Sequence, residues 1–503
     1  MTDRFRNGLS LALIMAGVLG LEMIGLRSGT IGVILIGLLC GIALIIFAVR
    51  VELKWAAVIA LCASAFTLTW NGWFIGPVRP GDVLVLVALI CFVLADPNHA
   101  LRWPPWWVKQ LGFVIAFVTV FHVFFPTGDD YLTHRIVLNG VGKPVASYKG
   151  SLAGANLGVG FKFIVATVFV ALAFAAAVRV DRRAVQWLTL SFVTGTALSG
   201  LVAFTDGRGW TQLTKLIVKG RACASTVGGG CSQHKGGSNR QLGFSNHPNF
   251  LAAGVVIAAP FAVWLLAKRE RTKLELIIGA CTLPALVLGV YSTGSRGGAA
   301  CMVGALALSI AVFPRTRQYI AGWAIFGVLM VGVIIAFLPG LGDAILRATR
   351  LKGSNTTTGG SDLVRSIVGH QGVLDWQHSP ITGVGLQVSF EASQVYLQEL
   401  ASGGLLLFTA MSIYMLGGVF TAFRLMPESD LAAAVLASLI AILALNIFEA
   451  DLTDRFYYLP VAILVAYVHA REPDPPTEED QGGYADPHRR SSPQGPPRPA
   501  MTS

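Results

Sequence analysis

The sequence predicts an all-α membrane protein, a bundle of about 12 to 14 transmembrane helices with a large outward loop that contains short helices. Hydrophobic residues make up 54% of the 503 positions, and charged residues only 13%. The mean hydropathy is +0.64. Apolar stretches long enough to cross a bilayer recur along the chain. Together these observations exclude an ordinary soluble protein and indicate a polytopic membrane protein.

The predicted helices follow these apolar stretches in order, because each crossing needs about 20 mainly apolar residues. They divide the chain into N-terminal transmembrane helices (1–204), a core with large loops (205–425), a C-terminal transmembrane hairpin (426–471) and a Pro-rich tail (472–503) that is expected to be disordered in the cytoplasm. The expected spans lie near residues 9–26, 30–49, 54–70, 82–96, 108–125, 160–179, 187–204, 250–267, 274–291, 298–313, 319–338, 398–422, 430–448 and 456–470.

The distribution of Lys and Arg over the short loops predicts the orientation. Basic residues fall on alternate loops, which the positive-inside bias assigns to the cytoplasm together with both termini. The first apolar stretch lacks a small-residue cleavage site and is expected to be a span and not a cleaved signal peptide. The long loops at 126–159, 205–249 and 339–397 then share the outer face.

The outward loop at 205–249 is strongly basic. Such an excess opposes the positive-inside bias and suggests an anionic partner such as a phosphate, with anionic lipid headgroups as the alternative. Five of the seven cysteines lie in apolar spans, whereas Cys223 and Cys231 lie in this loop and are able to pair if the compartment is oxidising. The basic residues of the loop, set against the single acid Asp206, are Arg208, Lys215, Lys219, Arg221, Lys235 and Arg240.

A polar segment at residues 239–249 directly precedes the apolar stretch at 250–266. Polar groups where a chain enters a bilayer are costly to desolvate unless they meet a partner or a ligand. His247, Pro248 and Asn249 suit a helix start, and the planar fork of Arg240 suits two phosphate oxygens. A helix cap with a snorkelling arginine explains the same residues equally well.

A second arginine, Arg296, follows Ser295 in the glycine-containing connection at 292–298 on the same face. Glycines beside an arginine let backbone amides approach an anion, although a tight turn between two helices also explains them. Two arginines on one face suit a diphosphate leaving group, whose developing charge needs neutralisation.

The large outward loop holds further titratable groups and is expected to fold into short helices over the outer face. Groups close to a bilayer are candidates for acid or base chemistry, although loop residues are often simply solvated. The acids beside Arg455 (Glu449, Asp451 and Asp454) are able to pair with the arginines above, bind a sugar, or cap a helix. The candidates in the large loop are Arg365, His370, Asp375, His378, Glu391, Gln394, Tyr396, Gln398 and the element Pro380 to Gly385.

Several common signatures are absent from the sequence. We find no P-loop, no zinc-type Cys/His spacing and no GxSxG motif, and nothing predicts a metal, a cofactor or a nucleic-acid partner. Energy for any chemistry must therefore come with an activated substrate.

Residues 205 to 415 resemble the O-antigen ligase and O-antigen polymerase superfamily of bacterial membrane glycosyltransferases. That family has an arginine and glycine before an HPN-like helix start, a Ser-Arg-Gly turn, and a large loop with an arginine, a Pro-x-x-Gly-x-Gly element and an AHNxYLQxLAxxG-like helix start. The matches in this chain are Arg240 to Gly243, His247 to Asn249, Ser295 to Gly297, Arg365, Pro380 to Gly385 and Ala392 to Gly404.

The resemblance implies a GT-C-type helix bundle in the bacterial cytoplasmic membrane and a metal-independent inverting transfer. A glycan would pass from a polyprenyl-diphosphate carrier to an acceptor hydroxyl of a glycan or glycolipid on the outer leaflet. Arg240 and Arg296 would hold the diphosphate, and Arg365 would help to order or neutralise it. The substrate would also contact Lys235, His247, Asn249, Ser295, Gln394, Tyr396 and Gln398.

A pair of positions departs from the family pattern. Ser393 and Gln394 stand where ligases of the family have a His-Asn pair, and neither side chain is a good base at neutral pH. Glu391, His370 or His378 would then act as the base, or positioning and charge neutralisation would suffice. Two alternatives remain open: a transporter or flippase of a lipid-linked sugar or anion, and a catalytically inactive envelope scaffold.

Overall fold

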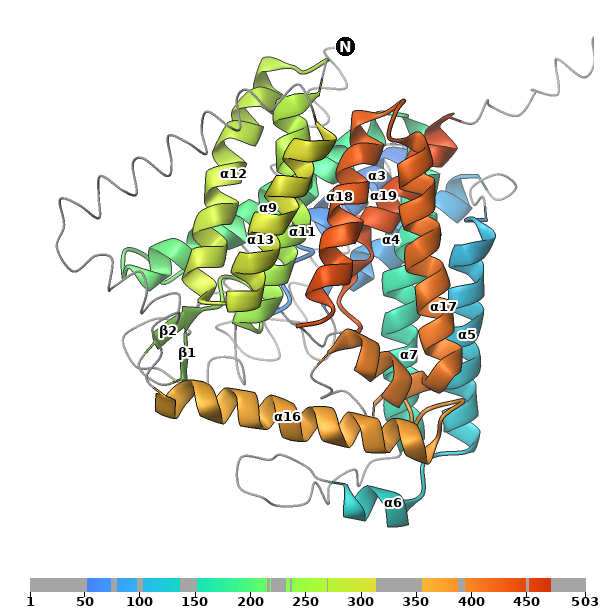
Figure 1. The fold of residues 1–503 in the computed structure, drawn as a ribbon. Helices are drawn as coiled ribbons and strands as arrows, with labels where there is room; N and C mark the ends of the chain where they lie inside the picture. The colour runs from blue at the N-terminus through green and yellow to red at the C-terminus, as the bar shows by residue number, and fades with distance from the viewer. Residues whose placement is uncertain are drawn as a thin grey trace, which may run out of the picture.

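The computed structural model describes residues 52–73, 79–96, 103–135, 152–214, 218, 232–235, 238–268, 270–313, 355–387, 394–448 and 452–471 (Figure 1). Within these residues the chain is mostly helical, which agrees with the predicted all-α polytopic bundle. The expected spans at 9–26, 30–49 and 319–338, the cysteines Cys223 and Cys231, and the tail lie outside the described residues.

The helices lie close to the predicted spans. A π-helical turn, Val165–Phe169, joins α7 to α8, and a 3₁₀ turn, η4 (Arg455–Tyr457), precedes α19. The α-helices are α3 (Leu53–Phe66), α4 (Pro80–Ala95), α5 (Trp106–Phe124), α6 (Asp129–His134), α7 (Leu152–Ile164), α8 (Val170–Val180), α9 (Ala184–Gly207), α11 (Pro248–Ala267), α12 (Lys273–Thr293), α13 (Arg296–Val312), α16 (Asn355–His378), α17 (Val395–Leu425), α18 (Asp430–Leu445) and α19 (Leu459–Arg471).

Six helical stretches in the described part are long and apolar enough to cross a membrane. Five shorter apolar helices, α3, α4, α13, α18 and α19, pack with them. Large apolar side chains such as Phe113 and Phe124 of α5 are exposed, which suits contact with lipid. The six stretches are Trp106–Phe124, Gly154–Val180, Ala184–Gly207, Pro248–Ala267, Lys273–Thr293 and Val395–Leu425.

Helix α11 lies in the middle of the bundle, and every residue from 251 to 265 is buried. It packs against α9, α12, α13 and α18. Ser438 of α18 donates a hydrogen bond to the Ile257 carbonyl of α11 at 2.6 Å, which fixes the level of one helix against the other. The polar segment that begins α11 is therefore held by a rigid core.

Helix α17 is broken at Gly404, whose φ of 63° and ψ of −159° are accessible to glycine and not to other residues. The element from Pro380 to Gly385 pairs with the break. The Val384 amide donates to the Ala401 carbonyl at 2.8 Å, and the Leu405 amide donates to the Pro380 carbonyl at 2.8 Å. These bonds satisfy backbone groups that the broken helix leaves free.

The expectation of short helices in the large loop is wrong for residues 355–378, which form one 24-residue helix, α16. In Figure 1 α16 runs across the lower ends of the bundle helices, with α6 beyond it. A side chain at Gly372 would meet Leu397 of α17 at 2.9 Å, so α16 packs closely there. The later half of α16 packs against α17 and carries the buried Asp375.

A short antiparallel hairpin interrupts the helical pattern. Strand β1 (Ser232–Lys235) pairs with β2 (Ser238–Gln241), and Gln233 lies opposite Arg240. The all-α prediction did not include this hairpin, since its polar residues lack the alternation by which a half-buried strand is recognised. Its effect is to place Arg240 on an ordered element.

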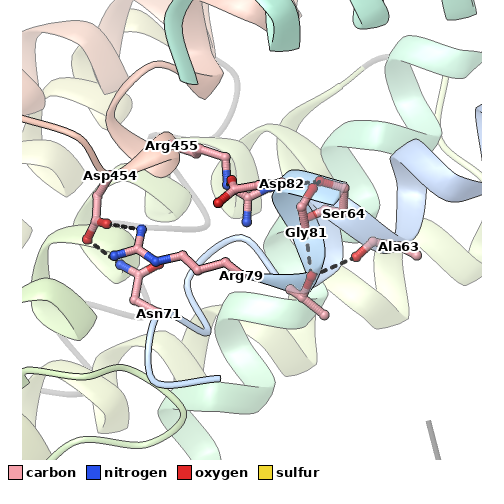
Figure 2. A network of polar contacts seen from close by, with 9 residues as sticks. Ala63, Ser64, Asn71, Arg79, Gly81, Asp82, Asp454 and Arg455 are labelled. Carbon is pink, nitrogen blue, oxygen red and sulfur yellow. Dashed lines mark hydrogen bonds and ion pairs between the residues drawn. The ribbon is translucent and has the colours of Figure 1, made fainter. Parts of the chain in front are cut away.

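A buried ion network joins the α3–α4 connection to η4 (Figure 2). Arg79 pairs with Asp454, and Asn71 donates to the same carboxylate. The Arg455 guanidinium pairs with Asp82 at 2.7 Å and donates to Ser64 at 3.0 Å. Asp454 thus pairs with Arg79 and not with the arginines of the predicted site, while Glu449 and Asp451 lie outside the described residues.

Candidate functional site

Arg240 joins three elements at one end of the bundle. It lies on β2, and its Nε donates to the carbonyl of Thr293, the last residue of α12, at 2.9 Å. Its Nη2 donates to Oδ1 of Asn249 in the first turn of α11. A guanidinium at a helix C-terminus also suits the helix dipole. The two bonds fix the plane of the guanidinium, an orientation that the sequence does not predict.

The start of α11 is capped as the sequence predicts. Pro248 occupies the first helical position, and Nδ1 of His247 accepts a hydrogen bond from the Asn249 amide at 3.2 Å. Because Nδ1 accepts, a neutral His247 carries its proton on Nε2. The cap assigns His247 and Asn249 a structural role, whether or not they also contact a ligand.

Arg296 is the first residue of α13 and its side chain is exposed. Gly294 ends α12 in the left-handed conformation, with φ of 59°, and Ser295 caps α13 by accepting a hydrogen bond from the Gly298 amide at 3.2 Å. The turn between helices is therefore confirmed for Ser295. A Cβ on Gly298 would lie 2.6 Å from the Ala252 side chain, so the first turns of α13 and α11 are in contact.

The first turn of α17 is bound to the end of α18. The Val395 amide donates to the Asn446 carbonyl at 3.1 Å, and the Tyr396 hydroxyl donates to the Leu443 carbonyl at 2.8 Å. Oε1 of Gln398 accepts from the Leu452 amide at 3.1 Å. Gln394 precedes the helix and is exposed. Two further residues of this region, Glu391 and Ser393, lie outside the described residues.

Helix α16 carries the remaining candidates. Arg365 and His370 are exposed, as solvated residues would be. Asp375 is only 1% exposed, so the expectation that it is a solvated loop residue is wrong. His378 is exposed but stacks on the ring of Tyr131, with 3.8 Å between ring centroids.

The buried Asp375 accepts hydrogen bonds from Arg135 at 2.9 and 2.5 Å, from Tyr131 at 2.7 Å and from Gln371 at 2.8 Å. Burial, with the hydrogen bond to Asp375 and its charge, raises the pKa of Tyr131. Nothing in the sequence indicates Arg135 and Tyr131, because Arg135 is 240 positions from Asp375 and no local pattern connects residues so far apart. The cluster binds α16 to the short helix α6.

The starts of α11, α13 and α17 meet the end of α18. Helices α11 and α18 run antiparallel, and Ser438 of α18 lies level with Ile257 of α11. Eight residues toward the end of α18 and eight residues toward the start of α11 therefore bring Asn446 and Asn249 to about the same height. A Cβ on Gly297 would lie 3.2 Å from Phe448. This end of the bundle therefore combines helix N-termini, which favour anions, with Arg240 and Arg296.

Two further sequence candidates lie on other elements. Lys235 lies on β1, where the structure describes the backbone alone. His378 lies at the far end of α16 against α6. Within the described residues no group of three His, Cys, Asp or Glu side chains is arranged to hold a metal ion.

Comparison of the chain with models of protein families and with curated protein sequences finds no match. The arrangement of its own residues is therefore the basis for a functional proposal.

Proposed function

We propose that the protein transfers or polymerises a glycan from a polyprenyl-diphosphate-linked donor to an acceptor hydroxyl. The reaction takes place at the outer face of the bacterial cytoplasmic membrane, in the synthesis of a cell-envelope polysaccharide. The protein would be an integral-membrane glycosyltransferase of the GT-C type, related to the O-antigen ligases and polymerases. The observation that carries the proposal is that Arg240 and Arg296 lie at the same end of the bundle, where the first turns of α11 and α13 are in contact.

In this mechanism the two arginines hold the diphosphate of the donor. The acceptor oxygen bonds to the anomeric carbon while the bond from that carbon to the diphosphate oxygen breaks. The electron pair of the broken bond leaves with the diphosphate, and the proton of the acceptor hydroxyl passes to water at the outer face. Cations that are already in position stabilise that developing charge. Thr293 and Asn249 orient the Arg240 fork, and the helix N-termini add partial positive charge.

A deletion strain tests the proposal in cells. The strain is expected to accumulate a lipid-linked glycan, identified by mass spectrometry, that disappears when the wild-type gene is restored. Arg240→Ala and Arg296→Ala should leave the intermediate in place at normal protein levels. Arg208→Ala is the matched control, because Arg208 is a basic residue at the end of α9 that rests over the Phe204 ring. Full activity of both site variants would refute the mechanism.

A transporter or flippase of a lipid-linked sugar is the second candidate. The break in α17 at Gly404 favours it, because discontinuous helices commonly form the binding sites of transporters. Purified protein in detergent separates the two functions. A transferase consumes the lipid-linked glycan extracted from the deletion strain without any vesicle or gradient, whereas a transporter leaves it unchanged.

A further inference from the structure

A buried turn at residues 242–245 connects the strand that carries Arg240 to the start of α11, and it lies directly on helix α9. The Phe244 amide donates a hydrogen bond to Oγ of Ser199 at 3.0 Å, and Ser199 is fully buried. Gly243 has a φ of 56°, and a Cβ there would lie 2.4 Å from the Ser199 carbonyl oxygen. The turn therefore approaches the α9 backbone as closely as only a glycine allows.

The other side of this turn packs against the connection between α3 and α4. The Phe244 carbonyl accepts a hydrogen bond from the Gly72 amide at 2.9 Å, and the Phe244 ring lies 4.5 Å from the Trp70 ring between centroids. Nε1 of Trp70 donates to the Gly195 carbonyl of α9 at 3.1 Å. The turn is thus held from two sides, and it cannot move away from α9 without breaking these contacts.

The position of the turn decides where the guanidinium of Arg240 lies. Arg240 is only three positions before Gly243, so a shift of the turn moves the backbone of Arg240 with it. The fork of Arg240 donates to Thr293 at the end of α12 and to Asn249 in the first turn of α11. Hydrogen bonds weaken steeply as their distance and angle depart from the optimum, so both bonds require β2 at one depth.

We propose that Ser199 and Gly243 are positioning residues that place Arg240 for the diphosphate. The inference rests on the proposed function, and it extends the site to Ser199, which precedes the segment that resembles the ligases and polymerases. Neither residue contacts the substrate. Gly243 lets the turn approach α9, Ser199 accepts the hydrogen bond that holds it there, and both act through the Arg240 fork.

The test measures binding of farnesyl diphosphate, a short polyprenyl diphosphate, to the detergent-purified full chain by microscale thermophoresis. Gly243→Ala should weaken binding by at least about tenfold, because the added methyl group meets the α9 backbone and displaces the turn that carries Arg240. Gly209→Ala is the matched control. Gly209 has a φ of 73°, so alanine meets the same backbone strain there, but nothing lies within 4 Å of the added atom. This control should bind as the wild type does.

Ser199→Ala is a milder second variant, and it decides the question if Gly243→Ala does not fold. It removes one acceptor and should weaken binding about fivefold. Ser309→Ala is its matched control, because Ser309 is equally buried and its hydroxyl donates within its own helix, to the Ala305 carbonyl at 2.7 Å. The control should lower the Tm by a similar amount and leave the binding of farnesyl diphosphate unchanged.

Double variants separate positioning of Arg240 from a general structural role. In an Arg240→Ala background, Gly243→Ala and Ser199→Ala should cause no further loss of binding, because the group that they place is gone. The same loss in that background as in the wild type would overturn the inference. Wild-type binding in both single variants would also overturn it, while a loss of binding in Arg240→Ala would leave the proposed function standing.

Failure of the proposed function has a different signature. The diphosphate mechanism fails if the wild type does not bind farnesyl diphosphate, or if Arg240→Ala and Arg296→Ala bind it as tightly as the wild type. Hydrogen exchange without any ligand then tests the placement alone. Gly243→Ala should speed exchange of the β2 amides and Gly209→Ala should not, which supports the placement of Arg240 by α9. Unchanged exchange in Gly243→Ala would refute that placement.

Discussion

Asp375 and Arg135 form a bidentate ion pair across 240 residues of sequence, with N–O distances of 2.9 and 2.5 Å. The pair binds α16 to the segment that follows α6, and its side chains are 1% and 11% exposed. Breaking one side of such a pair leaves a buried charge without compensation. The position of α16, and with it that of Arg365, depends on this contact.

Asp375→Asn should destabilise this region by about 3 to 5 kcal/mol, because Arg135 keeps its charge and loses its partner. Hydrogen exchange of α16 amides and thermal unfolding measure the effect. Glu428→Gln is the control, since Glu428 pairs with Arg471 at the surface, where the side chains are 58% and 43% exposed. Solvent screens that exposed pair, so its loss should change stability little. Equal effects of the two substitutions would contradict the buried role of Asp375.

Gly404→Ala should destabilise the protein by at least about 3 kcal/mol. Its φ is positive, and a Cβ there would lie 2.3 Å from the Ile381 carbonyl. Gly304→Ala in α13 is the matched control, because nothing lies within 4 Å of the added atom. Alanine is the better helix former, so this change should stabilise by up to about 1 kcal/mol. Thermal unfolding in detergent compares the two, and equal Tm values would argue against the break in α17.

If the proposed function holds, Arg240→Lys and Arg296→Lys should differ in their effect on glycan transfer. A lysine at 240 cannot reproduce the fork that reaches both Thr293 and Asn249, so we expect a loss of at least about tenfold. Arg296 is exposed at the start of α13, where a lysine keeps the charge, and the loss should be about threefold or less. Clearance of the lipid-linked intermediate gives the rates. Full activity of Arg240→Lys would show that the fork geometry is not needed.

Asp454→Leu and Arg79→Met should each lower stability by about 3 to 5 kcal/mol, because each leaves the other charge buried. The double variant removes both charges. It should lose less than the sum of the single losses, by about 1 to 3 kcal/mol, in a double-mutant cycle followed by thermal unfolding. Additive losses would indicate that the two side chains do not interact.

Tyr131 should ionise only above its ordinary pKa of about 10, because burial and Asp375 raise that pKa. The protonated hydroxyl stabilises the contact with Asp375. This contribution is therefore complete below about pH 10 and is lost as the pH rises through the raised folded-state pKa. The difference in phenolate absorbance between wild type and Tyr131→Phe measures the transition. Asp375→Asn should move it back toward 10, and an unshifted transition in the wild type would contradict the interaction.

Local patterns predicted the helices well. The start of α11 at Pro248 and the turn at Ser295 followed from short-range capping and glycine signals, and both are observed. The same reasoning missed the single helix α16 and the hairpin that carries Arg240. These elements are stabilised by distant residues such as Arg135, which no local period reveals.

Hydropathy and local motifs were enough to predict an apolar helix bundle, to place most helix ends, and to identify the arginines that flank the starts of α11 and α13. Those features depend on hydropathy and on contacts within a few residues. The long-range pairings, such as those of Arg240 with Thr293, Asp454 with Arg79 and Asp375 with Arg135, could be read only from the folded structure. Such pairings depend on which helix ends lie side by side, and the packing of all the helices in the bundle determines that arrangement.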